Sequence, residues 1–124
     1  LSLPNSPIEA NISLSEIKKI IDLCKKYNCL IVFDEAYHGF GSKSQIQKYK
    51  KHNNVIITRS FSKSFGLTAI RLGILISNKK IVNKVEIKRL AYETNIFSSI
   101  FAQHFIKNYK IVKDYNNEII KSRK

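Results

Sequence analysis

The sequence predicts an α/β fold, which we expect to be a three-layer αβα sandwich around a mostly parallel sheet. Three apolar runs of strand length, at 29–33, 54–59 and 72–77, alternate with segments of helical periodicity. The first two runs are apolar on both faces, which is typical of strands in a parallel sheet covered by helices. With 124 residues, the chain is long enough for one domain with one core.

The first helix is expected to begin after Ser13, because Ser13 and Glu16 match the S-x-x-E pattern of a capping box. Apolar residues then recur at helical spacing and predict one buried stripe. The residues of this stripe are Leu14, Ile17, Ile20, Ile21, Cys24 and Tyr27. Asn28 suits a left-handed residue that ends the helix just before the first strand.

The segments between the strands are expected to be largely loop. Residues 34–53 carry a short helical pattern around 44–51, and residues 60–71 form a loop that contains Gly66. Glycine permits a close approach of the backbone or an unusual dihedral angle at that point.

Two helices are expected after the third strand. Asn78 can cap a helix that runs to about Leu90. A break near 94–95 separates it from a long final helix over roughly 97–121. The expected element order is therefore helix, strand, short helix, strand, loop, strand and two helices.

The net charge of +13 invites a nucleic-acid-binding interpretation. The 22 lysines and arginines, however, are spread over helix faces and loops rather than gathered on one stripe, as on a solvated surface. No apolar run approaches the roughly 20 residues that span a bilayer. Cys24 and Cys29 match no zinc spacing, so we expect no metal, and reduced thiols favour a cytoplasmic protein.

The chain starts without a methionine, in a loop-like stretch over 1–7. This start shows no signal-peptide pattern. We therefore expect the chain to be a central fragment of a longer protein.

Polar residues follow the first two predicted strands. Asp34 follows the first and Ser60 the second. In α/β sheets, ligands bind at the carboxyl ends of the strands, so these two residues should reach one crevice. Asp34 can be a helix cap or a member of a structural ion pair, or it can pair with the protonated nitrogen of a pyridine ring, which makes the ring an electron sink.

Lys63 is the candidate anchor for an aldehyde cofactor. It lies between Phe61 and Phe65, which can desolvate its amine and favour the neutral form that attacks an aldehyde. The same amine can later move the α-proton of a substrate. Tyr37 can donate a hydrogen bond to a hydroxyl of the cofactor ring, or it can simply pack at the sheet edge.

A phosphate-binding cradle is suggested by Ser60, Ser62 and Arg71, which provide two short hydroxyls and a planar guanidinium. The glycine-rich run of a Walker loop is missing before Lys63. An anchoring amine, a carboxylate and a phosphate cradle together predict a pyridoxal 5'-phosphate site.

These motifs occur in order: D-E-A-Y at 34–37, S-F-S-K-S-F-G at 60–66 and R-L-G at 71–73. With this order the chain resembles the fold type I pyridoxal-phosphate aminotransferases of class I/II, closest to their histidinol-phosphate aminotransferase branch. The resemblance implies that Lys63 forms the internal aldimine. It also implies that Asp34 binds the pyridine nitrogen, Tyr37 the ring oxygen, and Ser60, Ser62 and Arg71 the phosphate.

One position departs from the family pattern. Where the family has an asparagine before a proline, as a ligand of the ring oxygen, this chain has Ser6. Serine is shorter and would reach the ring through water. The resemblance further implies that residues 1–124 are part of the large, cofactor-binding domain, that the helix over 97–124 leads to a missing small domain, and that the enzyme is a homodimer.

The expected activity is transfer of an amino group between an amino acid and a 2-keto acid or a phosphorylated keto compound. A decarboxylase of a phosphorylated amino acid on the same fold is the alternative, because both would share the cofactor cradle. A basic nucleic-acid-binding module is the alternative from another class. The fragment alone is expected to lack part of the cofactor site and of the substrate site.

Overall fold

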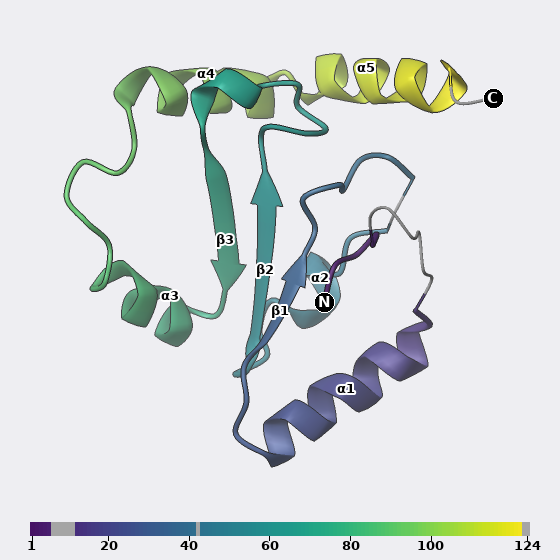
Figure 1. Ribbon diagram of the computed structural model, residues 1–124, viewed down its shortest axis with the longest axis vertical. Helices are drawn as coiled ribbons and strands as arrows, with labels where there is room; N and C mark the ends of the chain where they lie inside the picture. Colours follow the sequence, from purple (N-terminus) through teal and green to yellow (C-terminus); the bar gives the residue numbers. More distant parts are fainter. Residues whose placement is uncertain (6–11, 42, 123–124) are drawn as a thin grey trace.

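The computed structural model describes residues 1–5, 12–41 and 43–122, and its centre is a three-stranded sheet (Figure 1). The strands are β1 (Ile31–Asp34), β2 (Val55–Ser60) and β3 (Gly73–Ser77), in the order β1-β2-β3. β1 pairs parallel to β2, whereas β3 pairs antiparallel to β2. The α/β class is confirmed, with a mixed sheet where a mostly parallel one was expected. The segment between β2 and β3 turns the chain back without the helical crossover that a parallel neighbour needs.

Helix α1 (Leu14–Lys26) begins at the expected capping box. The backbone N–H of Ser13 donates to Glu16 Oε2 at 2.8 Å, and the N–H of Glu16 donates to Ser13 Oγ at 3.3 Å. Asn28 has the left-handed φ of 53° that ends the helix, as expected. The predicted buried stripe is too long, because the side chains of Leu14 and Tyr27 at its two ends are exposed.

The hydrophobic core lies between α1 and one face of the sheet. The buried side chains come from α1, from β1 and β2, and from the short helix α2 (Ile46–Tyr49). They are Ile17, Ile21, Ile31, Phe33, Tyr49, Val55 and Ile57. The opposite face is less covered in the described residues, since Val32 is 42% exposed and Leu75 36% exposed. One helical layer is therefore well packed against the sheet.

Helix α3 (Lys79–Glu86) is shorter than expected. Asn78 caps it as predicted, by accepting from the N–H of Ile81 at 3.1 Å. Its end comes before Leu90, because the N–H of Leu90 donates to the carboxylate of Glu93 at 2.8 Å instead of continuing the helical pattern. The chain then turns toward the next helix.

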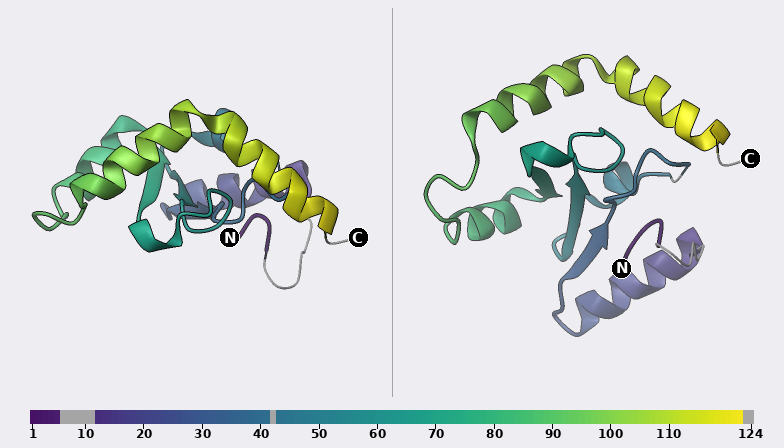
Figure 2. Two further views of the ribbon diagram at one scale, coloured as in Figure 1. Left: turned by 90° about the horizontal axis from the view of Figure 1, so that it is seen from above. Right: turned by 45° about the horizontal axis from the view of Figure 1, so that its top comes forward.

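The predicted final helix is two helices, α4 (Ile96–Lys107) and α5 (Tyr109–Ser122). The break falls at Asn108, whose side-chain amide and backbone N–H both donate to the carbonyl oxygen of His104. An asparagine that bonds the last turn in this way competes with continuation of the helix. Figures 1 and 2 show α4 and α5 running across the end of the sheet toward which β1 and β2 point.

The 3₁₀ helix η1 (Thr68–Ile70) completes the elements that surround this end of the sheet. Within the described ranges, the helices lack the length and apolar character needed to cross a bilayer.

Candidate active site

Asp34 is the last residue of β1 and lies in register with Thr58 of β2. Its Oδ1 accepts hydrogen bonds from the N–H of Ala36 at 2.9 Å and from the hydroxyl of Thr58 at 3.5 Å. The side chain is exposed and, among the described residues, forms no salt bridge. The carboxylate therefore remains at the carboxyl edge of the sheet, where it can meet a cationic group from outside the chain.

Ser60 ends β2, which runs two residues beyond the partner of Asp34. Its Oγ accepts from the backbone N–H of Ser62 at 3.0 Å. The structure thus brings Asp34 and Ser60 to the same edge, as the alternation of strands and helices predicts. A role for Thr58 was missed, because a threonine within a strand carries no distinctive sequence signal.

Lys63 lies in the loop after β2 and reaches back over the segment after β1. Its Nζ is 5.1 Å from the centre of the Tyr37 ring, a cation–π contact. Lys63 and the D-E-A-Y segment are therefore neighbours in space. Since Lys63 is exposed, the expected desolvation of its amine is not seen. The rings of Phe61 and Phe65 pack on each other at 4.7 Å instead.

The loop that carries Lys63 is closed on itself by hydrogen bonds. The hydroxyl of Thr68 donates to the carbonyl of Ser62 at 3.0 Å, and Arg71 Nη1 donates to the carbonyl of Thr68 at 3.3 Å. Arg71 is exposed and has a left-handed φ of 49°. Thr68 thus links two of the predicted phosphate ligands, Ser62 and Arg71. Nothing in the sequence pattern singled out Thr68.

A buried polar network lies beside this edge. Glu35, which is 2% exposed, accepts from Arg59 Nη2 at 2.8 Å and from the hydroxyl of Ser44 at 3.0 Å. These residues join the ends of β1 and β2. The neighbouring Asp34 takes no part in the ion pair between Arg59 and Glu35. The network is therefore a support of the edge, separate from its exposed polar groups.

His38 is half-buried next to this network. Burial lowers the pKa of its imidazole from 6.5, the nearby Arg59 guanidinium lowers it further, and Glu35 acts in the opposite direction. Its Nδ1 is buried and has no hydrogen-bond partner within the described residues. The neutral imidazole is the favoured form in the folded protein.

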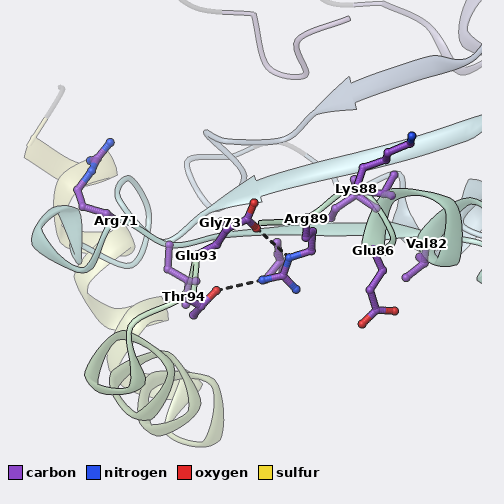
Figure 3. Close-up of a pocket in the computed structure, with 12 residues that line it drawn as sticks. Arg71, Gly73, Val82, Glu86, Lys88, Arg89, Glu93 and Thr94 are labelled. Carbon is purple, nitrogen blue, oxygen red and sulfur yellow. Dashed lines mark hydrogen bonds and ion pairs between the residues drawn. The ribbon is translucent and has the colours of Figure 1, made fainter. Parts of the chain in front are cut away.

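A cavity of 690 Å³ lies at another place, between β3, α3 and the segment 88–94. Figure 3 shows Arg89 bound to Glu93 and Thr94 there, while the side chain of Arg71 points away from them. Neither Lys63 nor Asp34 lines this cavity. Arg71 is the one predicted site residue, among those described, that lines it.

The groups at the edge match the needs of pyridoxal 5'-phosphate. The chain offers an amine for an aldehyde, a carboxylate for a ring nitrogen, a phenol for a ring hydroxyl, and hydroxyls with a guanidinium for a phosphate. Of the six predicted site residues that the structure describes, five lie on β1, on β2 or shortly after them. The sixth, Arg71, is joined to them through Thr68. The seventh predicted site residue, Ser6, lies outside the described residues.

Comparison with known sequences finds a match over residues 2–124 to the family described as aminotransferase class I and II. A histidinol-phosphate aminotransferase of Pyrococcus furiosus is 33% identical over 123 residues, which are 99% of this chain and 35% of that enzyme. The chain therefore spans about a third of the length of such relatives.

Solved structures share the fold. The histidinol-phosphate aminotransferase of Sinorhizobium meliloti in complex with pyridoxal-5'-phosphate superimposes with a TM-score of 0.84 at 22% identity, covering 99% of this chain and 34% of that one. The L-threonine-O-3-phosphate decarboxylase of Porphyromonas gingivalis superimposes with a TM-score of 0.70 at 22% identity, covering 85% of this chain and 32% of that one. At these identities the likeness concerns the fold.

Proposed function

Because this chain belongs to the class I and II aminotransferases, we propose that it carries the cofactor-anchoring residues of an enzyme that transfers an amino group. The donor is an amino acid, and the acceptor is a 2-keto acid or a phosphorylated keto compound such as the substrate of the histidinol-phosphate branch. The position of the Lys63 amine over Tyr37, three residues after the carboxylate that ends β1, supports this proposal most directly.

When bound, pyridoxal 5'-phosphate supplies an aldehyde and a ring that stabilises negative charge on the substrate's α-carbon. In our proposal, Lys63 holds the cofactor covalently and, once released, its Nζ removes and returns the α-proton. The Asp34 carboxylate would keep a proton on the ring nitrogen, and it is oriented for this by the N–H of Ala36 and the hydroxyl of Thr58. The phenol of Tyr37 binds the ring oxygen, together with Ser6.

Ser60, Ser62 and Arg71 would bind the phosphate. The backbone of Ser62 is held by Ser60 Oγ on one side and by the Thr68 hydroxyl on the other. Since Arg71 bonds to the same Thr68, its guanidinium is placed by the loop that also carries Lys63. Phosphate binding would therefore fix the loop at the same time as the cofactor.

The test uses the full-length protein that contains this chain, incubated with pyridoxal 5'-phosphate. Borohydride reduction followed by peptide mass spectrometry is expected to find the cofactor on Lys63. The Lys63→Ala variant should lack the attached mass, whereas a control at an exposed lysine of α3, Lys79→Ala, should keep it. Attachment that is undiminished in Lys63→Ala would refute the assignment of the anchor.

A decarboxylase of a phosphorylated amino acid is the second candidate, since the superposition on the P. gingivalis decarboxylase shows the same fold with that activity. The site residues described above would serve both reactions. Amino transfer to added keto acids and release of carbon dioxide, measured in parallel, separate the two activities. We also propose that the full-length protein is a cytoplasmic homodimer, as the family resemblance implies. Light scattering of the full-length protein would test the dimeric state.

A further inference from the structure

The residues that follow Lys63 lie against helix α5, far along the chain. The ring of Phe65 lies 6.0 Å from the ring of Tyr109. A β-carbon placed on Gly66 would be 3.6 Å from the ring of Tyr115, so α5 also covers the backbone at that residue. The loop that carries the predicted anchor is therefore packed on its C-terminal side by one helix.

Three segments come together around Gly39. A β-carbon placed on Gly39 would lie 2.8 Å from Cβ of Ser64 and 2.9 Å from Nδ2 of Asn116. Gly39 follows the D-E-A-Y segment, Ser64 is next to Lys63, and Asn116 lies on α5. Ser64 is one residue after Lys63, and Gly39 is two residues after Tyr37. This close approach and the contact between Lys63 and Tyr37 therefore join the same two segments.

Asn116 is an unusual residue for this position. It is 3% exposed and follows Val112, 2% exposed, by one helical turn, so it continues the buried stripe of α5. Its Oδ1 is buried without a hydrogen-bond partner in the described part of the chain. Burying an unpaired amide oxygen is unfavourable, and an apolar side chain would fill such a stripe at lower cost. The amide is therefore a candidate for a role beyond packing.

We propose that Asn116 is a positioning residue for Lys63, in which its side-chain amide fixes how closely Ser64 and Gly39 approach. By packing against Gly39 next to Ser64, Asn116 keeps the Lys63 amine over Tyr37. This inference rests on the proposed function, since it concerns the geometry in which Lys63 reacts with the cofactor. A small displacement of a reacting amine costs much of its reactivity.

The experiment uses full-length protein from which bound cofactor has been removed. Pyridoxal 5'-phosphate is added back, and the return of the visible absorption of the bound cofactor is followed over time. The absorption is then titrated against pH. Asn116→Ala removes the amide and its volume, and Asn116→Leu removes the amide but keeps a side chain of similar size. Asn117→Ala is the matched control, because Asn117 is the next residue of the same helix and is exposed.

Asn116→Ala and Asn116→Leu are expected to regain the absorption about tenfold more slowly or worse and to shift the midpoint of its pH titration. Asn117→Ala should match the wild type in both measurements. Wild-type behaviour of Asn116→Leu would overturn the inference, because packing alone would then suffice. If Asn116→Ala loses its cooperative thermal unfolding, Asn116→Leu carries the test.

The outcomes also separate this inference from the proposed function. If the wild-type protein itself gains no visible absorption and no attached mass at Lys63, the proposed function fails. If the wild type binds the cofactor at Lys63 and both Asn116 variants behave as the Asn117 control does, only the positioning role fails.

Discussion

Arg59 and Glu35 form an ion pair of 2.8 Å that joins the end of β2 to the residue just after β1. The Glu35 side chain is 1% exposed and that of Arg59 is 22% exposed. The negative charge of the buried carboxylate is therefore balanced by this guanidinium. Each residue of the pair is next to a predicted cofactor ligand, Asp34 or Ser60. The pair thus holds together two strand ends that, in our proposal, bind one cofactor molecule.

Replacing Arg59 by methionine is expected to lower the free energy of unfolding by about 3 kcal/mol, because it leaves a buried carboxylate without its partner. The double variant, Glu35→Gln with Arg59→Met, should recover much of this loss, since the buried charge is then gone. Denaturant unfolding of the two single variants and the double variant measures the coupling. Additive losses would show that the two side chains stabilise the fold independently.

Replacing Asp34 by alanine is expected to lower turnover by about a thousandfold or more, since the ring nitrogen would lose the carboxylate that keeps it charged. Attachment of pyridoxal 5'-phosphate to Lys63 should persist in this variant, because the amine is untouched. The control is Asp22→Ala, at an exposed carboxylate of α1. Turnover in Asp34→Ala equal to that of this control would remove the proposed role of Asp34.

Gly39→Ala is expected to destabilise the protein more than Gly41→Ala. Both glycines have positive φ angles, 112° and 103°, so both substitutions strain the backbone. Only at Gly39 does the new methyl group meet atoms of Ser64 and Asn116, whereas at Gly41 it meets no atom of the described residues within 4 Å. The difference in unfolding free energy should be about 1–3 kcal/mol. Equal losses in thermal or denaturant unfolding would contradict the close contact.

His38 is expected to make stability depend on pH in the acidic range. Its pKa in the folded state lies below the ordinary 6.5, so the unfolded chain binds more protons at this site once the pH falls below 6.5. The contribution of the neutral imidazole is therefore complete above that value and is lost as the pH falls toward the lowered pKa. The difference in unfolding free energy between wild type and His38→Gln, measured at several pH values, should change in that direction. A constant difference would contradict the lowered pKa.

Features that depend on neighbours in the chain were predicted well. The capping box at Ser13 and Glu16, the left-handed Asn28 and the cap at Asn78 are local hydrogen-bonding or backbone preferences, and all three are confirmed. The break at Asn108 was missed because apolar residues continue through it. The helix ends there despite the helical periodicity, because the Asn108 side chain donates to the carbonyl oxygen of His104.

The placement of the candidate site residues was predictable where they follow strand ends and not where it depends on helix packing. The sequence by itself determined that a lysine, a carboxylate and several hydroxyls follow two neighbouring strands, since strand ends can be read from apolar runs. Only the tertiary structure decided that β3 reverses, that Lys63 lies over Tyr37, and that Asn116 closes on Gly39. The first kind of information is local hydrogen bonding and periodicity. The second kind of information is how segments far apart in the chain pack against one another. No short stretch of sequence contains it.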